Sequence, residues 1–273
     1  MDPALILGLI LLSVIAGLIG SLFGLGGGII VVPVLTVLYD LPAHEAVAIS
    51  LVTITAISSA SASALVRDRI ANVRLGMTIK VAAASGAVIG SVIALFVQSD
   101  ALTLSFAFVM IYSAVYMFLR PERRVPDDEA EGEDVFVYHD HRTEKDVRYR
   151  VRNIRTGMVG FLVGGIISPL SGVGGGAINV PIMNVHMNIP MKVATATSSL
   201  IIGITAFMGA VVYLLNGVLD VQTASVVVIG AFAGSELGIR ILPKIDTASL
   251  RRYFSVVLVF LAMVMFLKVG GVL

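Results

Sequence analysis

Cysteine is absent from the 273-residue chain, and its absence excludes disulfide bonds, a thiol nucleophile and cysteine ligands for a metal. Charged residues are scarce as well: they make up 14% of the chain, whereas ordinary soluble domains carry about a quarter. Apolar runs of about 20 residues, the length that crosses a bilayer, recur along the sequence. A net charge of only +1 gives no reason to expect a nucleic-acid partner. The sequence therefore predicts an all-α polytopic membrane protein in a lipid bilayer.

Positive charge is missing from the N-terminal region, where the first Lys or Arg is Arg67. A secretory signal peptide begins with a positive segment, so we expect the apolar N-terminal run to belong to the mature protein. A nucleotide-binding motif is missing too, because no Lys follows the glycine clusters and GVGGGA has no acidic partner about 20 residues further on. We therefore expect neither ATP-driven pumping nor a bound cofactor.

Groups that carry out catalysis are equally scarce. No nucleophile and base stand out together within the apolar runs, so we do not expect an enzyme. His139 and His141 are too few to predict a metal site without further ligands. His44, Glu45 and His186 fall between apolar segments, where we expect solvated loop residues rather than carriers of protons.

Two glycine-rich stretches are the most distinctive feature that is present. GLGGGIIVVP (residues 24–33) and GVGGGAINVP (residues 172–181) align with an offset of 174 − 26 = 148 residues. The same offset holds without a gap from Gly26 to Phe118, which predicts a tandem duplication of residues 4–119 and 152–267. The resulting domains are repeat one (1–120), a charged cytoplasmic linker (121–151) and repeat two (152–273). Matched pairs include Pro42 with Pro190, Ala46 with Ala194, Ser50 with Ser198, Asn72 with Asp220, Gly86 with Gly234 and Gly90 with Gly238.

Each copy divides into five apolar segments. In the first copy these are residues 4–22, 27–39, 44–66, 75–97 and 101–119, and in the second 155–171, 176–185, 192–215, 221–242 and 249–268. The linker contains two short alternating runs, Asp134–Tyr138 and Val147–Val151, around the polar stretch HDHRTEKD. This pattern predicts a small β-hairpin.

The loop charges predict the orientation of the segments, because Lys and Arg favour the cytoplasmic side. The loop after the third segment is positive only in the first copy, and the loop after the fourth segment is positive only in the second. Corresponding loops therefore lie on opposite faces, which predicts inverted-topology repeats as in many secondary transporters. In a bacterial-type inner membrane, the central loop is then cytoplasmic and both termini are outside. The basic residues concerned are Arg67, Arg69, Arg74, Arg240, Lys244, Arg251 and Arg252.

The first two segments of each copy are too short for two full crossings. The second segments, at about 1.5 Å per residue, reach roughly half of the hydrocarbon thickness. We therefore predict a re-entrant hairpin in each copy, followed by three transmembrane helices, with the glycines at the hairpin tip in positive-φ conformations. Helix N-termini that start at the two tips and face one region would attract an anion. The alternative is that the glycines only pack helices together.

The doubled motif, early in each half and followed by a Ser/Thr-rich helix, resembles the TauE/SafE family of membrane permeases. The resemblance covers nearly the whole chain apart from the charged insert between the halves. It implies transport, usually export, of sulfur-containing anions such as sulfite or organosulfonates of the sulfoacetate or taurine type.

A sulfur oxyanion needs several hydrogen-bond donors, so we expect its site at the glycine tips and at nearby polar side chains. Ser50, Ser198 and Asn179 are the strongest candidates, and Ser168 also flanks the second tip. Membrane Ser and Thr often bond only their own helix or a neighbour, which is the alternative for each of them. The full set of predicted substrate-binding residues is Gly26, Gly27, Gly28, Ser50, Thr53, Ser171, Gly174, Gly175, Gly176, Asn179, Thr197 and Ser198.

Glu236 lies within an apolar segment and is therefore a candidate for coupling transport to an ion. Arg240 follows four residues later, so an ion pair near the membrane interface is an equal alternative. Glycines at small-xxx-small spacing predict close helix packing, and these are Gly86 with Gly90 and Gly234 with Gly238.

Together these features predict a secondary transporter that works by alternating access, with a small anion bound near the midplane between the tips. Two alternatives stay open. One is a permease for another small anion or metabolite, and the other is a membrane assembly or accessory protein.

Overall fold

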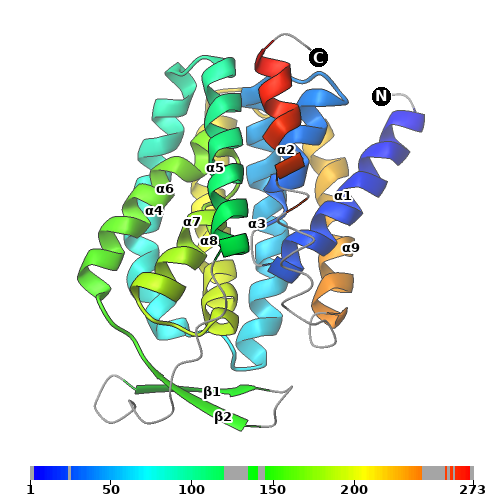
Figure 1. The fold of residues 1–273 in the computed structure, drawn as a ribbon. Coiled ribbons are helices and arrows are strands. Elements are labelled where there is room, and N and C mark those ends of the chain that lie inside the picture. Colours follow the sequence, from blue (N-terminus) through cyan, green and yellow to red (C-terminus); the bar gives the residue numbers. More distant parts are fainter. Residues whose placement is uncertain are drawn as a thin grey trace.

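The computed structural model describes residues 3–23, 26–119, 135–140, 145–241, 256, 259–260 and 262–270. They form a bundle of helices with a two-stranded β-hairpin below one end (Figure 1). The elements are α1 (Pro3–Phe23), α2 (Gly28–Val37), α3 (Ala43–Arg67), α4 (Val73–Phe96), α5 (Ser99–Leu119), β1 (Val135–Asp140), β2 (Lys145–Arg150), α6 (Ile154–Ser171), α7 (Gly176–Pro181), the π-helix η2 (Ile182–His186), α8 (Met191–Leu215) and α9 (Val221–Ile241). Residues 262–269 are also helical.

Five of these helices, α3, α4, α6, α8 and α9, are long and apolar enough to cross a membrane. Large apolar side chains on the outside of the bundle, such as Phe96 and Leu215, are exposed, as they would be toward lipid. The predicted multi-pass membrane protein is confirmed. The predicted features in residues 120–134, 141–144 and 242–255, including most of the charged linker, His141, Lys244, Arg251 and Arg252, lie outside the described residues.

The two halves of the chain repeat the same backbone conformations at the predicted offset. Helices α3 and α8 both contain 25 residues, and their first residues are 191 − 43 = 148 apart. Positive φ at residues other than glycine also recurs in register, at Asp40 and Asn188. Arg69, with φ 56°, corresponds to Gly217, with φ 70°. The duplication in the sequence therefore extends to the local structure.

Helix α7 departs from its counterpart α2, because it ends at Pro181 and continues as the π-helix η2. The proline is not the cause, because its counterpart Pro33 lies inside the regular helix α2. The chain closes a wider turn instead, in which the Met187 N–H donates to Ile182 O at 3.0 Å.

The helix pair α1 and α2 and the helix pair α6 and α7 approach the middle of the bundle from opposite ends (Figure 1). Helix α1 runs inward from the end that holds both termini, and α2 returns to that end. Helix α6 runs inward from the β-hairpin end, and α7 returns there. Each of these helix pairs packs on the other half of the chain: α1 packs on α9 and α6 packs on α4. Helices α3 and α8 pack on each other.

Glycines bring these helices into backbone contact. A Cβ added to Gly234 would lie 1.9 Å from Val14 O of α1, and one added to Gly86 would lie 2.2 Å from Leu162 O of α6. Gly90 and Gly238 are equally close to Ile166 O and to Ser21 Oγ, at 2.1 Å each. The packing role predicted for these four glycines is confirmed.

The predicted β-hairpin is present, with strands slightly longer at the turn than the alternating runs indicated. Antiparallel pairing joins Val135 to Arg150 and Phe136 to Tyr149. The Tyr149 side chain is turned toward the helices and only 2% of the residue is exposed. Its ring stacks on Phe136, with centroids 5.8 Å apart, and its hydroxyl accepts a hydrogen bond from Asn72 Nδ2 at 2.9 Å.

This burial makes the ionisation of Tyr149 a measure of hairpin docking. Burial raises the pKa of Tyr149 to about 12, and the hydrogen bond from Asn72 opposes this only in part. A free tyrosine ionises near pH 10, so docking keeps its full stability below about pH 10 and loses it as the pH rises toward 12. In a titration of phenolate absorbance, the difference between wild type and Tyr149→Phe is expected near pH 12. A difference centred near pH 10 would contradict the docked position.

Candidate functional site

The glycine tips have the backbone conformation that the sequence predicts. At the first tip φ is 76° for Gly26 and 74° for Gly27, and at the second it is 79° for Gly174 and 78° for Gly175. Gly27 and Gly175 are the N-cap residues of α2 and α7. Side chains with a Cβ rarely adopt such φ values, which accounts for glycine at these positions.

The two tips meet at the centre of the bundle, where α3 and α8 cross. A Cβ on Gly26 would lie 2.7 Å from Ile54 Cγ2 and 3.3 Å from Ile202 Cγ2. One on Gly174 would lie 2.9 and 2.8 Å from the same two atoms. Ile54 and Ile202 are themselves a matched pair, since 202 − 54 = 148. This pair was not predicted from the sequence, although each residue follows a predicted site serine by one helical turn.

The two tips also touch each other directly. A Cβ on Gly28 would lie only 2.3 Å from Gly172 O and 2.6 Å from Ser50 Oγ. Ser50 Oγ donates to Gly172 O at 2.7 Å, so this predicted substrate ligand holds the second tip in place. The contact leaves no room between Gly28 and Gly172 for a bound molecule.

Hydroxyl groups from other helices satisfy further carbonyls at the end of α6. Tyr213 Oη of α8 donates to Pro169 O at 3.2 Å, and Ser105 Oγ of α5 donates to Leu170 O at 3.2 Å. The end of a helix that is buried in protein needs such donors for its last carbonyls. Neither Tyr213 nor Ser105 was predicted from the sequence, because the donors come from helices distant along the chain.

Several polar atoms near the second tip have no partner. Four buried side-chain oxygens among the described residues lack a hydrogen bond, and three of them belong to the second half: Ser168 Oγ, Asn179 Oδ1 and Ser198 Oγ. Ser168 and Asn179 border the Gly175 cap, since a Cβ there would lie 3.4 Å from both Ser168 Cβ and Asn179 Nδ2. Ser198 precedes Ile202 by one turn, on the face of α8 that meets the tips. A buried polar atom without a partner costs about 1–3 kcal/mol, so these oxygens are available to a ligand.

The first tip has no counterpart of the polar side chains of Ser168 and Asn179. The residues 148 positions before Ser168 and Asn179 are Gly20 and Val31. Gly20 packs directly on the first tip, because a Cβ there would lie 2.3 Å from Gly27 N. The halves share a backbone but differ in chemistry at the tips, and the polar side belongs to the second half.

The remaining predicted site residues have local partners. Thr53 Oγ1 donates to Ile49 O of its own helix at 2.8 Å, and Ser171 Oγ donates to Ile167 O at 2.9 Å. Thr197 faces another element, since its Oγ1 accepts from the Asn72 N–H at 3.0 Å. Gly176 begins α7 directly after the second tip. The structure therefore brings together the tips, Ser50 and Asn179, but not the hydroxyls of Thr53, Ser171 and Thr197.

Glu236 is half-exposed and lies 4.0 Å from Arg240 one turn away on α9. This is the ion pair that the spacing offered as an alternative to a coupling role. Exposed pairs of this kind contribute little to stability.

The histidines are placed differently from the sequence prediction. His44 was expected in a solvated loop, but it lies in the first turn of α3 and is half-buried. Its ring nitrogens lie 3.1 Å from Ser99 Oγ and 3.1 Å from Ala94 O, which ties α3 to the end of α4 and the start of α5. Loop position alone did not show that two hydrogen-bonding groups face this ring. His186 ends η2, exposed, with Nε2 2.6 Å from Thr156 Oγ1.

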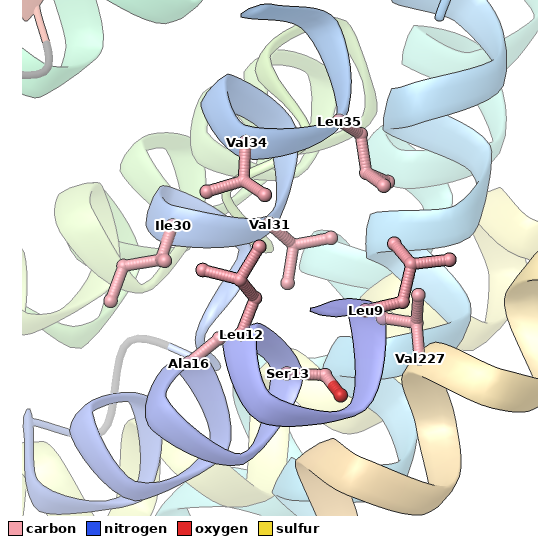
Figure 2. A pocket seen from close by; sticks show the side chains of 9 residues that line it. All are labelled: Leu9, Leu12, Ser13, Ala16, Ile30, Val31, Val34, Leu35 and Val227. Atoms are coloured by element: carbon pink, nitrogen blue, oxygen red, sulfur yellow. The ribbon is translucent and has the colours of Figure 1, made fainter. Parts of the chain in front are cut away.

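An apolar pocket lies between α1, α2 and α9, and Figure 2 shows the side chains that line it. Its lining is aliphatic apart from Ser13, whose hydroxyl donates to Ile10 O at 2.9 Å. The space therefore offers no free donor to an anion. Val31, the apolar counterpart of Asn179, forms part of its wall.

Known proteins with similar sequences are membrane transporters by name. The probable membrane transporter protein YunE of Bacillus subtilis is 29% identical over 258 residues, 92% of this chain and 93% of the relative. A probable membrane transporter protein of Methanocaldococcus jannaschii is 26% identical over 265 residues, 92% of this chain and 91% of the relative. The sulfite exporter TauE/SafE family protein 2 of Arabidopsis thaliana is 30% identical over 86 residues, 32% of this chain and 19% of the relative.

No solved structure gives a significant match to the chain. The family described as "Sulfite exporter TauE/SafE" matches residues 9–265, which include both glycine tips and every predicted site residue. The chain therefore belongs to the sulfite exporter TauE/SafE family.

Proposed function

We propose that the protein is a secondary transporter that exports sulfur-containing anions, either sulfite or organosulfonates such as sulfoacetate. The observation that carries this proposal is the group of unpartnered, buried oxygens at and beside the second glycine tip, on Ser168, Asn179 and Ser198. Family membership supports the substrate class. The Ser168 and Ser198 hydroxyls can donate to an oxyanion without a buried Lys or Arg, whereas the Asn179 amide can donate only through Nδ2, because its unpartnered Oδ1 accepts.

The proposed site is closed in this conformation. Gly28 and Gly172 touch, and Ser50 is bonded across the contact. An anion would enter when the tips separate, and the polar groups of the second tip would then bind its oxygens. The glycine N-caps allow close approach to the backbone there.

Alternating access follows from the architecture that we propose, with inverted-topology repeats and two re-entrant hairpins in a bacterial-type inner membrane. The opposite directions of α1 and α6 in Figure 1 support this arrangement. The central linker would then be cytoplasmic and both termini outside. Glu236 stays a candidate for ion coupling only if its pair with Arg240 opens during transport.

Flux of defined anions into proteoliposomes tests the function. Sulfite, sulfoacetate and taurine are expected to move, and each is expected to raise the thermal stability of the purified protein in proportion to its affinity. Selective movement of another anion or a metabolite would replace the substrate class. If no anion is transported and no anion stabilises the protein, the result would favour an assembly or accessory role.

Alanine at the matched serines separates binding from structure. Ser198→Ala removes an unpartnered oxygen, so stability is expected to stay unchanged or rise while flux falls at least about tenfold. Ser50→Ala leaves the buried Gly172 carbonyl without a donor, so the free energy of unfolding is expected to fall by about 1–3 kcal/mol. Thermal unfolding in detergent and flux in proteoliposomes measure both. Wild-type flux in a well-folded Ser198→Ala protein would overturn this assignment of Ser198.

A further inference from the structure

The β-hairpin connects the two halves of the chain through one asparagine. Asn72 caps α4 of the first half, where its Oδ1 accepts from the Leu75 N–H at 3.0 Å. Its Nδ2 donates to Tyr149 Oη of the hairpin, and its N–H donates to Thr197 Oγ1 of α8 in the second half at 3.0 Å. A single residue thus joins α4, α8 and β2.

Apolar packing reinforces this junction. Tyr149 and Val151 belong to one buried cluster with Leu75 of α4, Phe161 of α6 and Met187, the residue that follows η2. These elements surround the end of the bundle at which α7 and η2 return from the second tip (Figure 1). The hairpin therefore covers the end of the bundle to which α7 and η2 return.

The next backbone contact lies at the exit of the hairpin. The Arg152 N–H donates to Met187 O at 3.1 Å, and Asn153 Nδ2 donates to His186 O at 3.1 Å. The end of the returning segment is thus bonded to the chain that leaves the hairpin.

The opposite end of the bundle has no such junction among the described residues. Asp220 takes the place of Asn72, and its carboxylate accepts only from Gln222 and Thr223 at the start of its own helix. The counterpart of Thr197 is Ile49, which has no hydroxyl. Near that end, Lys268 pairs with the exposed Asp40 at 3.1 Å and donates to Thr36 O, while His44 bonds only to helices of the first half.

We propose that the β-hairpin is a strap that holds its end of the bundle shut and must release before the second tip opens to that side. This inference rests on the proposed transport function, because only alternating access requires that end to open. Opening would separate α4 from α8: the bond of Asn72 to Thr197 crosses that boundary, and the bond of Asn72 to Tyr149 ties the hairpin to it. The strap makes the two ends unequal, so that the resting protein favours closure at the hairpin end.

Thiol labelling tests the strap without any substrate, because the natural chain has no cysteine. Ala194→Cys places a reporter in the buried cluster beneath the hairpin, at a fully buried position. Ala46→Cys is the matched control, since it occupies the equivalent, equally buried position at the unstrapped end. Each reporter is combined with Tyr149→Phe, which removes the hydroxyl but keeps the ring, and with Asn72→Asp, which keeps both the cap and a partner for Tyr149.

With Tyr149→Phe, the rate of maleimide labelling at Ala194→Cys is expected to rise about fivefold, the factor for loss of one hydrogen bond of net ~1 kcal/mol. Labelling at Ala46→Cys is expected to stay constant, and Asn72→Asp is expected to leave both rates near their parent values. Tyr149→Ala extends the effect to roughly a hundredfold where that variant folds. An unchanged rate at Ala194→Cys, or equal increases at both reporters, would overturn the strap. Absence of sulfur-anion flux would instead overturn the transport function, which these rates do not measure.

Discussion

Flux of sulfur anions is expected to fall roughly a hundredfold to a thousandfold in the double variant Ser168→Ala with Asn179→Val. The two changes remove unpartnered, buried oxygens at the second tip, and valine is the residue that the first half has at the position of Asn179. Each lost contact to an oxyanion is worth about 1–3 kcal/mol, and two together give a reduction of this size. The double variant is expected to fold normally, because neither oxygen has a structural partner.

A matched control for this loss is Thr205→Val. Thr205 is also buried in the membrane helices, but its hydroxyl donates to Ile202 O and Ile201 O of its own helix at 3.0 and 3.3 Å. Its flux is expected to stay within about twofold of wild type, since such bonds contribute little beyond the helix itself. An equal loss of flux in the control and in the double variant would show that any change of a buried polar residue impairs flux. The second tip could then not be assigned as the anion site. Wild-type flux in the double variant would exclude the second tip as the anion site.

The parts of the fold that repeat could be predicted from the sequence. The offset of 148 residues locates both tips, and the observed positive φ of Gly27 and Gly175 follows from the need for a residue without a Cβ. The β-hairpin followed from two alternating runs, and its strands, Val135–Asp140 and Lys145–Arg150, agree within two residues at each end. These features depend on local patterns, which one sequence contains in full.

The state of each hydroxyl could not be predicted, because it depends on how the helices are rotated against each other. Thr197 and Ser198 are adjacent, yet Thr197 bonds to Asn72 of α4 whereas Ser198 has no partner. Both faces of α8 are buried here, so the hydrophobic pattern does not distinguish them. Thr53 similarly bonds to its own helix, a possibility that every membrane threonine has.

The docking of the β-hairpin on the helices could not be predicted from the sequence for a related reason. Alternation indicated which face of β2 is apolar, and Tyr149 lies on that face. Nothing in the pattern showed that Asn72, a loop residue matched to Asp220, would meet the tyrosine hydroxyl. Contacts between segments that are distant along the chain require the packed structure.

Gly234→Ala is expected to cause the largest loss of stability. The new methyl group would lie 1.9 Å from Val14 O, a backbone atom that cannot turn aside as a flexible side chain would. Helices α1 and α9 would have to move apart along their contact, which is expected to cost more than about 3 kcal/mol, the upper end for overpacking. A loss of stability would be informative, because helix propensity alone favours alanine over glycine by about 1 kcal/mol and would make the variant more stable. A fall of roughly 6–12 °C in the midpoint of thermal unfolding, with poor recovery from detergent, is the expected result.

The control for Gly234→Ala is Gly217→Asn, at a glycine that has open space around it. A Cβ there meets nothing within 4 Å, and its φ of 70° is one that asparagine tolerates. The matched position in the first half holds Arg69 at φ 56°, so the fold already accepts a side chain there. This variant is expected to unfold within about 2 °C of wild type.

The contrast between the two variants also bears on transport, because helices of different halves are packed together. Helix α1 of the first half packs on α9 of the second, and α6 of the second half packs on α4 of the first. The bodies that move during alternating access are therefore expected to combine helices from both halves. Equal stability of Gly234→Ala and Gly217→Asn would contradict the close contact of Gly234 with Val14 O. The two sequence halves would then be the expected moving units.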